Sequence, residues 1–179
     1  MPIVETGAAR APAALALATL TWPDEQATQA FAAALAGQSA LPDAFITLHG
    51  DLGAGKTTLA RHLLQALGVE GRIKSPTYTI VETYELPGLA ISHFDFYRFN
   101  DPQEWEDAGF RDLFASPGLK LVEWPQKAAG LLPEPDMDVF IEADGDSLRR
   151  VTLAAFTPRG QALVLAMSNT TATHPEGGA

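Results

Sequence analysis

The stretch LHGDLGAGKTTLARHLLQALG, residues 48–68, is the most informative part of this chain. It matches the pattern G-x-x-x-x-G-K-[ST], with Gly50, Gly55, Lys56 and Thr57 in the four fixed places. The glycines permit a tight turn that aims backbone N–H groups at an anion, and the helix that follows adds its positive end. Lys56 supplies a cation for the outer phosphates, and the Thr57 hydroxyl suits Mg²⁺. The stretch therefore predicts a cradle for the phosphates of a nucleoside triphosphate.

The residues around this loop have the context that such a cradle needs. Before it, FITL at 45–48 is a short apolar run, which is typical of a buried strand. After it, leucines recur every fourth residue over 59–67, which predicts an amphipathic helix that Gly68 ends. Thr58 is not required by the pattern, so an ordinary helix position is its alternative. The predicted nucleotide contacts are Gly50, Gly53, Ala54, Gly55, Lys56, Thr57 and Thr58.

Composition and charge narrow the class of protein. With 46% hydrophobic and 19% charged residues, the 179-residue chain is typical of one globular domain. It has no cysteine, which excludes disulfides, a thiolate nucleophile and cysteine-bound zinc. The net charge of −10 disfavours unassisted binding of RNA or DNA, because phosphate neutralisation needs a basic surface. An acidic surface is instead suited to a basic protein partner.

The amino-terminal residues do not predict export. The segment MPIVETGAAR carries Glu5 as well as Arg10 and lacks the basic start of a signal peptide. No run approaches the roughly 20 apolar residues that a membrane helix needs. We therefore expect a cytoplasmic protein with no membrane partner.

The remaining patterns predict one α/β domain over 21–167, with a lead-in at 1–20 and a flexible tail at 168–179. The turn signals LPG and DGDS predict two hairpins. Residues 24–26 are expected to open a helix, and Asp101 is expected to cap another. The expected strands are 18–22, 45–48, 75–85, 90–97, 119–124, 138–143 and 149–156, and the expected helices are 24–35, 56–67 and 102–108.

Two carboxylates stand where apolar runs end. Asp95 ends ISHFD, and Glu123 ends LKLVE. A triphosphate hydrolase needs a carboxylate near its metal, at the sheet edge where the cradle lies. Either acid is alternatively a surface carboxylate just past its strand. Together with the cradle, they predict that at least one serves a metal ion.

Neighbouring polar residues are weaker candidates. His93 can share a face with Asp95, or it is a structural histidine. Arg98 is a candidate for a phosphate contact or for a salt bridge. The hydroxyls of Ser75, Thr77 and Thr79 follow the first helix, where small GTPases have a segment that senses the γ-phosphate; strand packing is their alternative.

Several motifs together resemble a known family. The segments GDLGAGKTT, KSPTYTIVETYE, HFDFYR, DPQEWEDAGFRDLF and LVEWPQ occur in this order over 48–126. They look like the bacterial TsaE family, the small ATPase in the biosynthesis of N6-threonylcarbamoyladenosine (t6A) in tRNA. The cradle is shared by very many proteins, whereas the combination of SPTYT, HFDxYR and EWP is much more specific. Trp105 departs from the family pattern, because an aliphatic residue is usual there.

The resemblance implies a P-loop NTPase fold, a three-layer α/β/α sandwich whose mainly parallel sheet has antiparallel additions. It implies ATP and Mg²⁺ as ligands, with Thr57 and Glu123 on the metal and Asp95 in hydrolysis or in the metal shell. Lys56 completes the catalytic set. Residues 75–79 become a switch-like loop, and Trp124 shapes the site.

The resemblance also implies partners. The TsaB–TsaD pair is expected to carry out the transfer, while ATP hydrolysis by this protein resets that complex, and tRNA is contacted only through the complex.

Residues 26–28 and Arg150 are candidates for contacts with the adenine of ATP. Arg150 is alternatively an exposed strand arginine.

Two other functions fit the same cradle. One is a small-molecule kinase, which normally needs an acceptor pocket and a lid with several arginines. The chain has only eight arginines and no arginine-rich segment beyond Arg149 and Arg150. The other is a binding module that takes a nucleotide without hydrolysing it.

Overall fold

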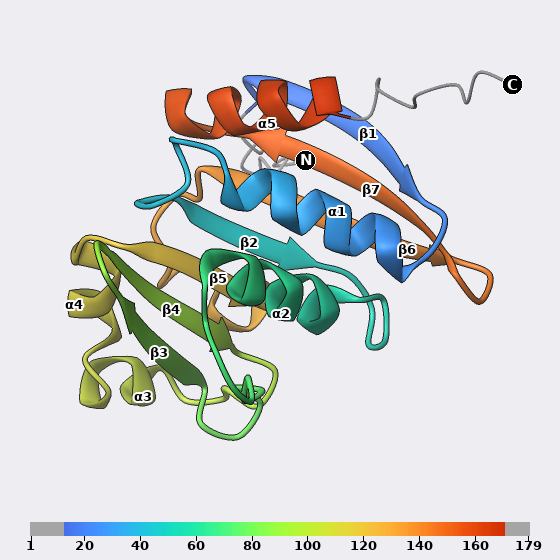
Figure 1. The fold of residues 1–179 in the computed structure, drawn as a ribbon. Coiled ribbons are helices and arrows are strands. Elements are labelled where there is room, and N and C mark those ends of the chain that lie inside the picture. The colour runs from blue at the N-terminus through green and yellow to red at the C-terminus, as the bar shows by residue number, and fades with distance from the viewer. Residues whose placement is uncertain (1–12, 171–179) are drawn as a thin grey trace, which may run out of the picture.

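A computed structural model describes residues 13–170 of the protein (Figure 1). The predicted lead-in at 1–20 and the tail at 168–179 therefore fall partly outside the described residues. None of the helices in residues 13–170 has the length and apolar character needed to cross a membrane. In chain order the elements are β1 (Ala16–Trp22), α1 (Glu25–Ala36), β2 (Phe45–His49), α2 (Lys56–Leu67), β3 (Val81–Leu86), β4 (Leu89–Asp95), α3 (Pro102–Asp107), α4 (Phe110–Ala115), β5 (Leu119–Glu123), the 3₁₀ helix η1 (Pro125–Ala128), β6 (Met137–Asp144), β7 (Leu148–Ala155) and α5 (Pro158–Thr170).

The strands form a single sheet in the order β1-β7-β6-β2-β5-β4-β3. Its centre is parallel, because β2 pairs in parallel with β5 and β6, and β5 with β4. Both edges are antiparallel, with β3 beside β4 and with β1 and β7 beyond β6. The carboxyl ends of β2, β4 and β5 consequently lie at one edge of the sheet, which is where the loop from β2 to α2 begins.

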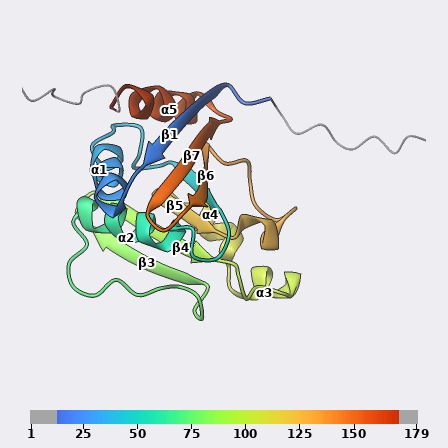
Figure 2. The same ribbon diagram turned by 90° about the vertical axis from the view of Figure 1, so that its right-hand side faces the viewer.

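Helices lie on both faces of the sheet. Figure 2 shows α1, α2 and α5 on one face and α3 and α4 on the other. Side chains alternate accordingly: Ile46 and Leu121 point into the cluster under α1, α2 and α5, whereas Phe45 and Val122 point into the cluster under α3 and α4. The second cluster is rich in aromatic rings, with Trp105 at 2% exposure among them. Trp105 thus packs with its helix face against this cluster.

Most predicted elements are present, with shifted ends. The Asp101 carboxylate accepts the Gln103 N–H at 2.9 Å, so the predicted cap is confirmed. The structure adds a second cap at the start of α1, where the Asp24 carboxylate accepts the Ala27 N–H at 2.9 Å. Both hairpins are confirmed as β3–β4 and β6–β7.

The prediction of a strand over 75–85 is wrong in its first six residues. The strand β3 begins only at Val81, and the chain before it turns. Pro76 has no N–H for a ladder, and its carbonyl accepts the Ile80 N–H at 2.7 Å. Ile80 itself has φ 68°, a left-handed conformation that interrupts extended backbone.

Candidate nucleotide and metal site

The loop between β2 and α2 has the backbone that its glycines predict. Gly50, Gly53 and Gly55 have φ of 153°, 81° and 113°, and Gly55 directly precedes the first residue of α2. A Cβ at Gly50 would lie 2.5 Å from the carbonyl oxygen of Ile141, so the backbone of β6 passes too close for a side chain. The loop therefore opens the helix with an N-terminus free of side-chain caps, a suitable place for an anion.

Lys56 is held beside this loop. Its ammonium donates to the carbonyls of Gly50 and Asp51 and lies 4.0 Å from the centre of the Trp124 ring. Burial lowers the pKa of Lys56, while the charges of Glu123, Asp95 and Asp51 oppose that shift. The sequence predicted that Trp124 shapes the site. Its ring contacts the Lys56 ammonium, and this cation–π interaction orients the lysine.

Thr57, Glu123 and His93 form a hydrogen-bonded chain across three elements. The Thr57 hydroxyl donates to Glu123 Oε1 at 2.6 Å, and His93 Nε2 lies 2.7 Å from Glu123 Oε2. The side chains of His93 and Glu123 are each 1% exposed. Because the Thr57 hydroxyl gives its hydrogen to Glu123, its oxygen lone pairs remain available to a cation.

Asp95 stands next to Glu123, because the two residues are Cα partners in the parallel pair β4–β5. Its carboxylate accepts the Tyr97 N–H at 2.9 Å and the Thr77 hydroxyl at 3.3 Å. Burial raises the pKa of Asp95, and the charge of Glu123 raises it further, while these two hydrogen bonds lower it. A neighbouring cation would relieve the repulsion between the two carboxylates.

The pieces meet in one cavity of about 240 Å³. Its walls hold three carboxylates and one ammonium, so the lining carries a net negative charge when no metal ion is bound. The lining residues are Asp51 to Thr58, Thr77, Asp95, Tyr97, Glu123 and Trp124. The cavity brings the loop predicted from the motif together with both of the strand-end acids.

The oxygen-rich lining fits a hard divalent cation. Within residues 13–170, no group of three or more His, Asp or Glu side chains is arranged to hold a metal ion by itself. Mg²⁺ does not require such a group, because it is usually held by one or two carboxylates together with water and substrate phosphates. Thr57, Glu123 and Asp95 have the chemistry of such a partial set.

The hydroxyl segment reaches this cavity through one residue. Thr77 lies between Ser75 Oγ, 2.7 Å from its hydroxyl, and the Asp95 carboxylate. Thr79 instead donates to Glu82 at 3.1 Å, away from the lining. Arg98 is exposed and stacks at 4.4 Å over the ring of Tyr78.

A second cavity, of about 250 Å³, lies across the same loop, where Gly53 to Gly55 and Thr58 meet α1 and β7. It includes Thr28 from the candidate segment 26–28, but not Arg150, which pairs with Asp144 at 2.8 Å in a different hollow. Sequence reasoning missed Arg149, whose Nε donates to the Ala54 carbonyl at 2.8 Å and braces the loop. No local motif indicates this role, since it follows from the position of β7.

The fold and the site define a mixed α/β protein with a glycine-rich loop at the carboxyl ends of the parallel central strands of its sheet. The family model described as "Threonylcarbamoyl adenosine biosynthesis protein TsaE" matches residues 22–151, and the chain belongs to this family. A protein of Haemophilus influenzae named tRNA threonylcarbamoyladenosine biosynthesis protein TsaE is 48% identical over 124 residues, which are 69% of this chain and 78% of that protein. The protein of the same name in Bacillus subtilis is 37% identical over 131 residues, 73% of this chain and 82% of that protein. The crystal structure of Bacillus subtilis YdiB is similar with a TM-score of 0.70 and 30% identity, covering 87% of this chain and 97% of YdiB.

Proposed function

We propose that this protein is a Mg²⁺-dependent ATPase with a P-loop NTPase fold that acts in the biosynthesis of t6A in tRNA. The observation that carries the proposal is the meeting of Lys56, Thr57, Asp95 and Glu123 at the glycine loop. Family membership supplies the pathway, because the relatives bear its name. The proposed location is the cytoplasm.

The two cavities beside the loop suit the two ends of ATP. The triphosphate tail belongs in the cavity with Lys56, where the loop N–H groups and the start of α2 meet. The base belongs across the loop, in the cavity that Trp22, Thr28 and Arg149 help to line. Thr58, which lines both cavities, is placed for the phosphate between them.

Each polar residue then has a distinct task. Lys56 binds the outer phosphates, and Thr57 with Glu123 holds Mg²⁺, which supplies charge neutralisation of the polyphosphate. His93 fixes the Glu123 carboxylate from behind. Asp95 accepts hydrogen bonds on both of its oxygens and is the group placed to orient an attacking water or to share the metal.

The transfer chemistry is assigned elsewhere. This protein is proposed not to transfer the threonylcarbamoyl group itself, and its ATP hydrolysis is proposed to drive a partner complex, TsaB with TsaD. tRNA is contacted through that complex, which agrees with the net charge of −10.

Phosphate release tests the proposal. The purified protein with ATP and Mg²⁺ is expected to release phosphate slowly, and TsaB and TsaD are expected to change the rate. Glu123→Gln is expected to bind ATP and lose release, because the amide cannot balance the metal's charge. Transfer of labelled phosphate to a metabolite would instead identify a kinase, and no release under any condition would identify a binding module.

A further inference from the structure

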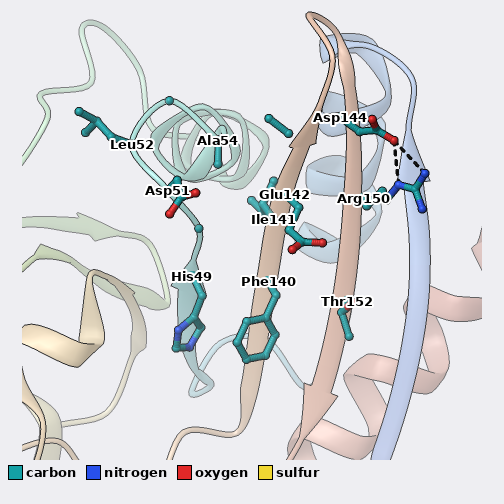
Figure 3. Close-up of a pocket in the computed structure, with 13 residues that line it drawn as sticks. His49, Asp51, Leu52, Ala54, Phe140, Ile141, Glu142, Asp144, Arg150 and Thr152 are labelled. Carbon is teal, nitrogen blue, oxygen red and sulfur yellow. Dashed lines mark hydrogen bonds and ion pairs between the residues drawn. The ribbon is translucent and has the colours of Figure 1, made fainter.

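A groove of about 900 Å³ lies on the outer side of the cradle, between the loop and the β6–β7 hairpin (Figure 3). Val139 and Ile141 of β6 pack in the cluster under α1, α2 and α5, so Phe140 and Glu142, which alternate with them and line the groove, face the opposite side of the sheet. The helices α3 and α4 pack on that face over β4, β5 and the start of β2, so within residues 13–170 no helix covers it at β6 and β7. The chemistry proposed above uses none of the side chains that line this groove from β6 and β7.

The floor of the groove holds a pair of aromatic rings, one from β2 and one from β6, that cover one face of each other. The rings of His49 and Phe140 stack with centroids 4.5 Å apart and planes 21° apart. Asp138 at 3.3 Å and Thr47 at 3.1 Å hold His49 Nε2, so the histidine ring of this pair has a fixed orientation. Phe140 is 38% exposed, so part of its ring is open to a ligand in the groove.

The rim of the groove is acidic. Figure 3 shows Asp51 on the loop and Glu142 on β6 at opposite sides of the hollow. Both are exposed, and neither forms an ion pair with any of the described residues. The one arginine of the lining, Arg150, is already neutralised by Asp144 at 2.8 Å. The groove therefore has two carboxylates that a cationic partner would complement.

We propose that this groove binds an arginine side chain of a partner protein. A guanidinium is planar, so it stacks on the outer ring face that the His49–Phe140 pair leaves open, while its N–H groups reach Asp51 and Glu142. A lysine ammonium is a compact, strongly hydrated point charge and gains less from a flat ring. A nucleic-acid backbone would be repelled by the same carboxylates.

The groove is joined to the nucleotide site through the loop itself. Asp51, Leu52, Gly53 and Ala54 line both this groove and the cavity that holds Lys56. Leu52 is 76% exposed at the tip, beside the groove. A nucleotide bound on the inner side of the loop thus fixes the position of the Asp51 carboxylate, which a partner contacts from the outer side. The inference rests on the proposed function only in this coupling, and the groove itself stands without it.

A peptide titration tests the groove without any natural partner. The probes are acetyl-Gly-Arg-Gly-amide and its lysine analogue, added to ¹⁵N-labelled full-length protein. The arginine peptide is expected to shift the amide resonances of His49, Phe140 and Glu142, and the lysine analogue is expected to shift them less. Phe140→Ala and Glu142→Lys should each abolish these shifts, while Glu85→Lys, an exposed acid on the far edge strand β3, should preserve them. Equal shifts with both peptides, or shifts spread over the surface, would overturn the proposal.

A second arm uses the TsaB–TsaD pair of the same organism in calorimetry with the ATP-loaded protein. Glu142→Lys and Phe140→Ala are expected to weaken binding about tenfold or more, in line with a desolvated cation–π contact, and Glu85→Lys to leave it unchanged. Unchanged binding in the first two variants would contradict the groove as the docking site. If the wild type does not bind the pair, the proposed function loses its partner, and the peptide titration still decides the groove.

Discussion

The hydrogen-bonded chain from Thr57 through Glu123 to His93 is the most informative feature at the scale of single residues. His93 is fully buried, and its Nδ1 has no hydrogen-bond partner in the structure, so the contact with Glu123 is its one polar interaction among the described residues. A buried histidine in this setting donates from Nε2 to the carboxylate and fixes the orientation of that group. Of the two interpretations that the sequence left open for His93, this geometry favours a role in the site.

We expect His93→Leu to weaken Mn²⁺ binding to the ATP-loaded protein by about 10- to 100-fold, the usual range when a supporting partner of a metal ligand is removed. His93→Gln should keep most of the affinity, because its amide N–H can replace Nε2. Electron paramagnetic titration of free Mn²⁺ measures both. The same loss in both variants would mean that packing, and not the hydrogen bond, is what matters.

Asp95 supports a prediction about pH. The pKa of Asp95 is raised in the folded protein. At a pH between the ordinary pKa and the raised pKa, the folded protein therefore holds a proton on Asp95 that the unfolded chain has lost. The ionised carboxylate therefore destabilises the nucleotide-free protein at neutral pH, and protonation relieves this. Asp95→Asn is expected to raise the thermal unfolding temperature at neutral pH, with a difference that shrinks under mildly acidic conditions. Calorimetric scans across this range check it, and a lower unfolding temperature for the variant at neutral pH would contradict it.

At the scale of elements, the sequence predicted the parts that carry strong local signals. The apolar run FITL predicted β2, the glycine pattern predicted the loop, and the leucines at spacing four predicted α2. Each of these local patterns is typical of one kind of structure. The turn before β3 and the two helices α4 and α5 were missed. In α5, Gly160 reads as a helix breaker, yet a Cβ there would overlap the Asp136 carbonyl, so the glycine lets the helix approach the sheet. Only the tertiary contact explains that residue.

The cluster under α3 and α4 gives a prediction about stability. These helices have only six residues each and depend on packing, because so short a helix is not stable alone. Trp105 contacts Phe96, Phe110 and Phe114 with ring centroids 5.4–6.2 Å apart. Trp105→Ala is expected to cost about 3–5 kcal/mol of the free energy of unfolding, measured by urea denaturation. Trp105→Leu, which keeps a large apolar side chain at this position, should cost clearly less; equal losses would argue against a packing role.

At the scale of the whole molecule, the sheet order decides which residues meet. The sequence predicted that Asp95 and Glu123 end strands, but it did not show that β4 and β5 are parallel neighbours. That pairing brings residues 28 positions apart to one edge, and the pairing of β5 with β2 brings them to the loop. The position of Arg149 and the lining of the outer groove follow in the same way from the pairing of β6 and β7. Local sequence motifs therefore could not predict them.

The overall charge also makes a prediction at this scale. With a net charge of −10, the isolated protein is not expected to shift tRNA in a gel at physiological salt. Addition of TsaB and TsaD should produce a shift that contains this protein, since the complex is proposed to hold the tRNA. A tight shift by the protein alone would contradict the proposed indirect contact.

The central claim is that the glycine loop and the acids of β4 and β5 hold one metal–triphosphate unit. A crystal structure with a non-hydrolysable ATP analogue and Mn²⁺, with the metal located by anomalous scattering, tests it most directly. We predict one metal peak bonded to Thr57 Oγ1 and to the β- and γ-phosphates, with Glu123 and Asp95 in contact with the ion or with its water ligands. A triphosphate bound away from Lys56, or a metal with neither carboxylate near it, would contradict the account.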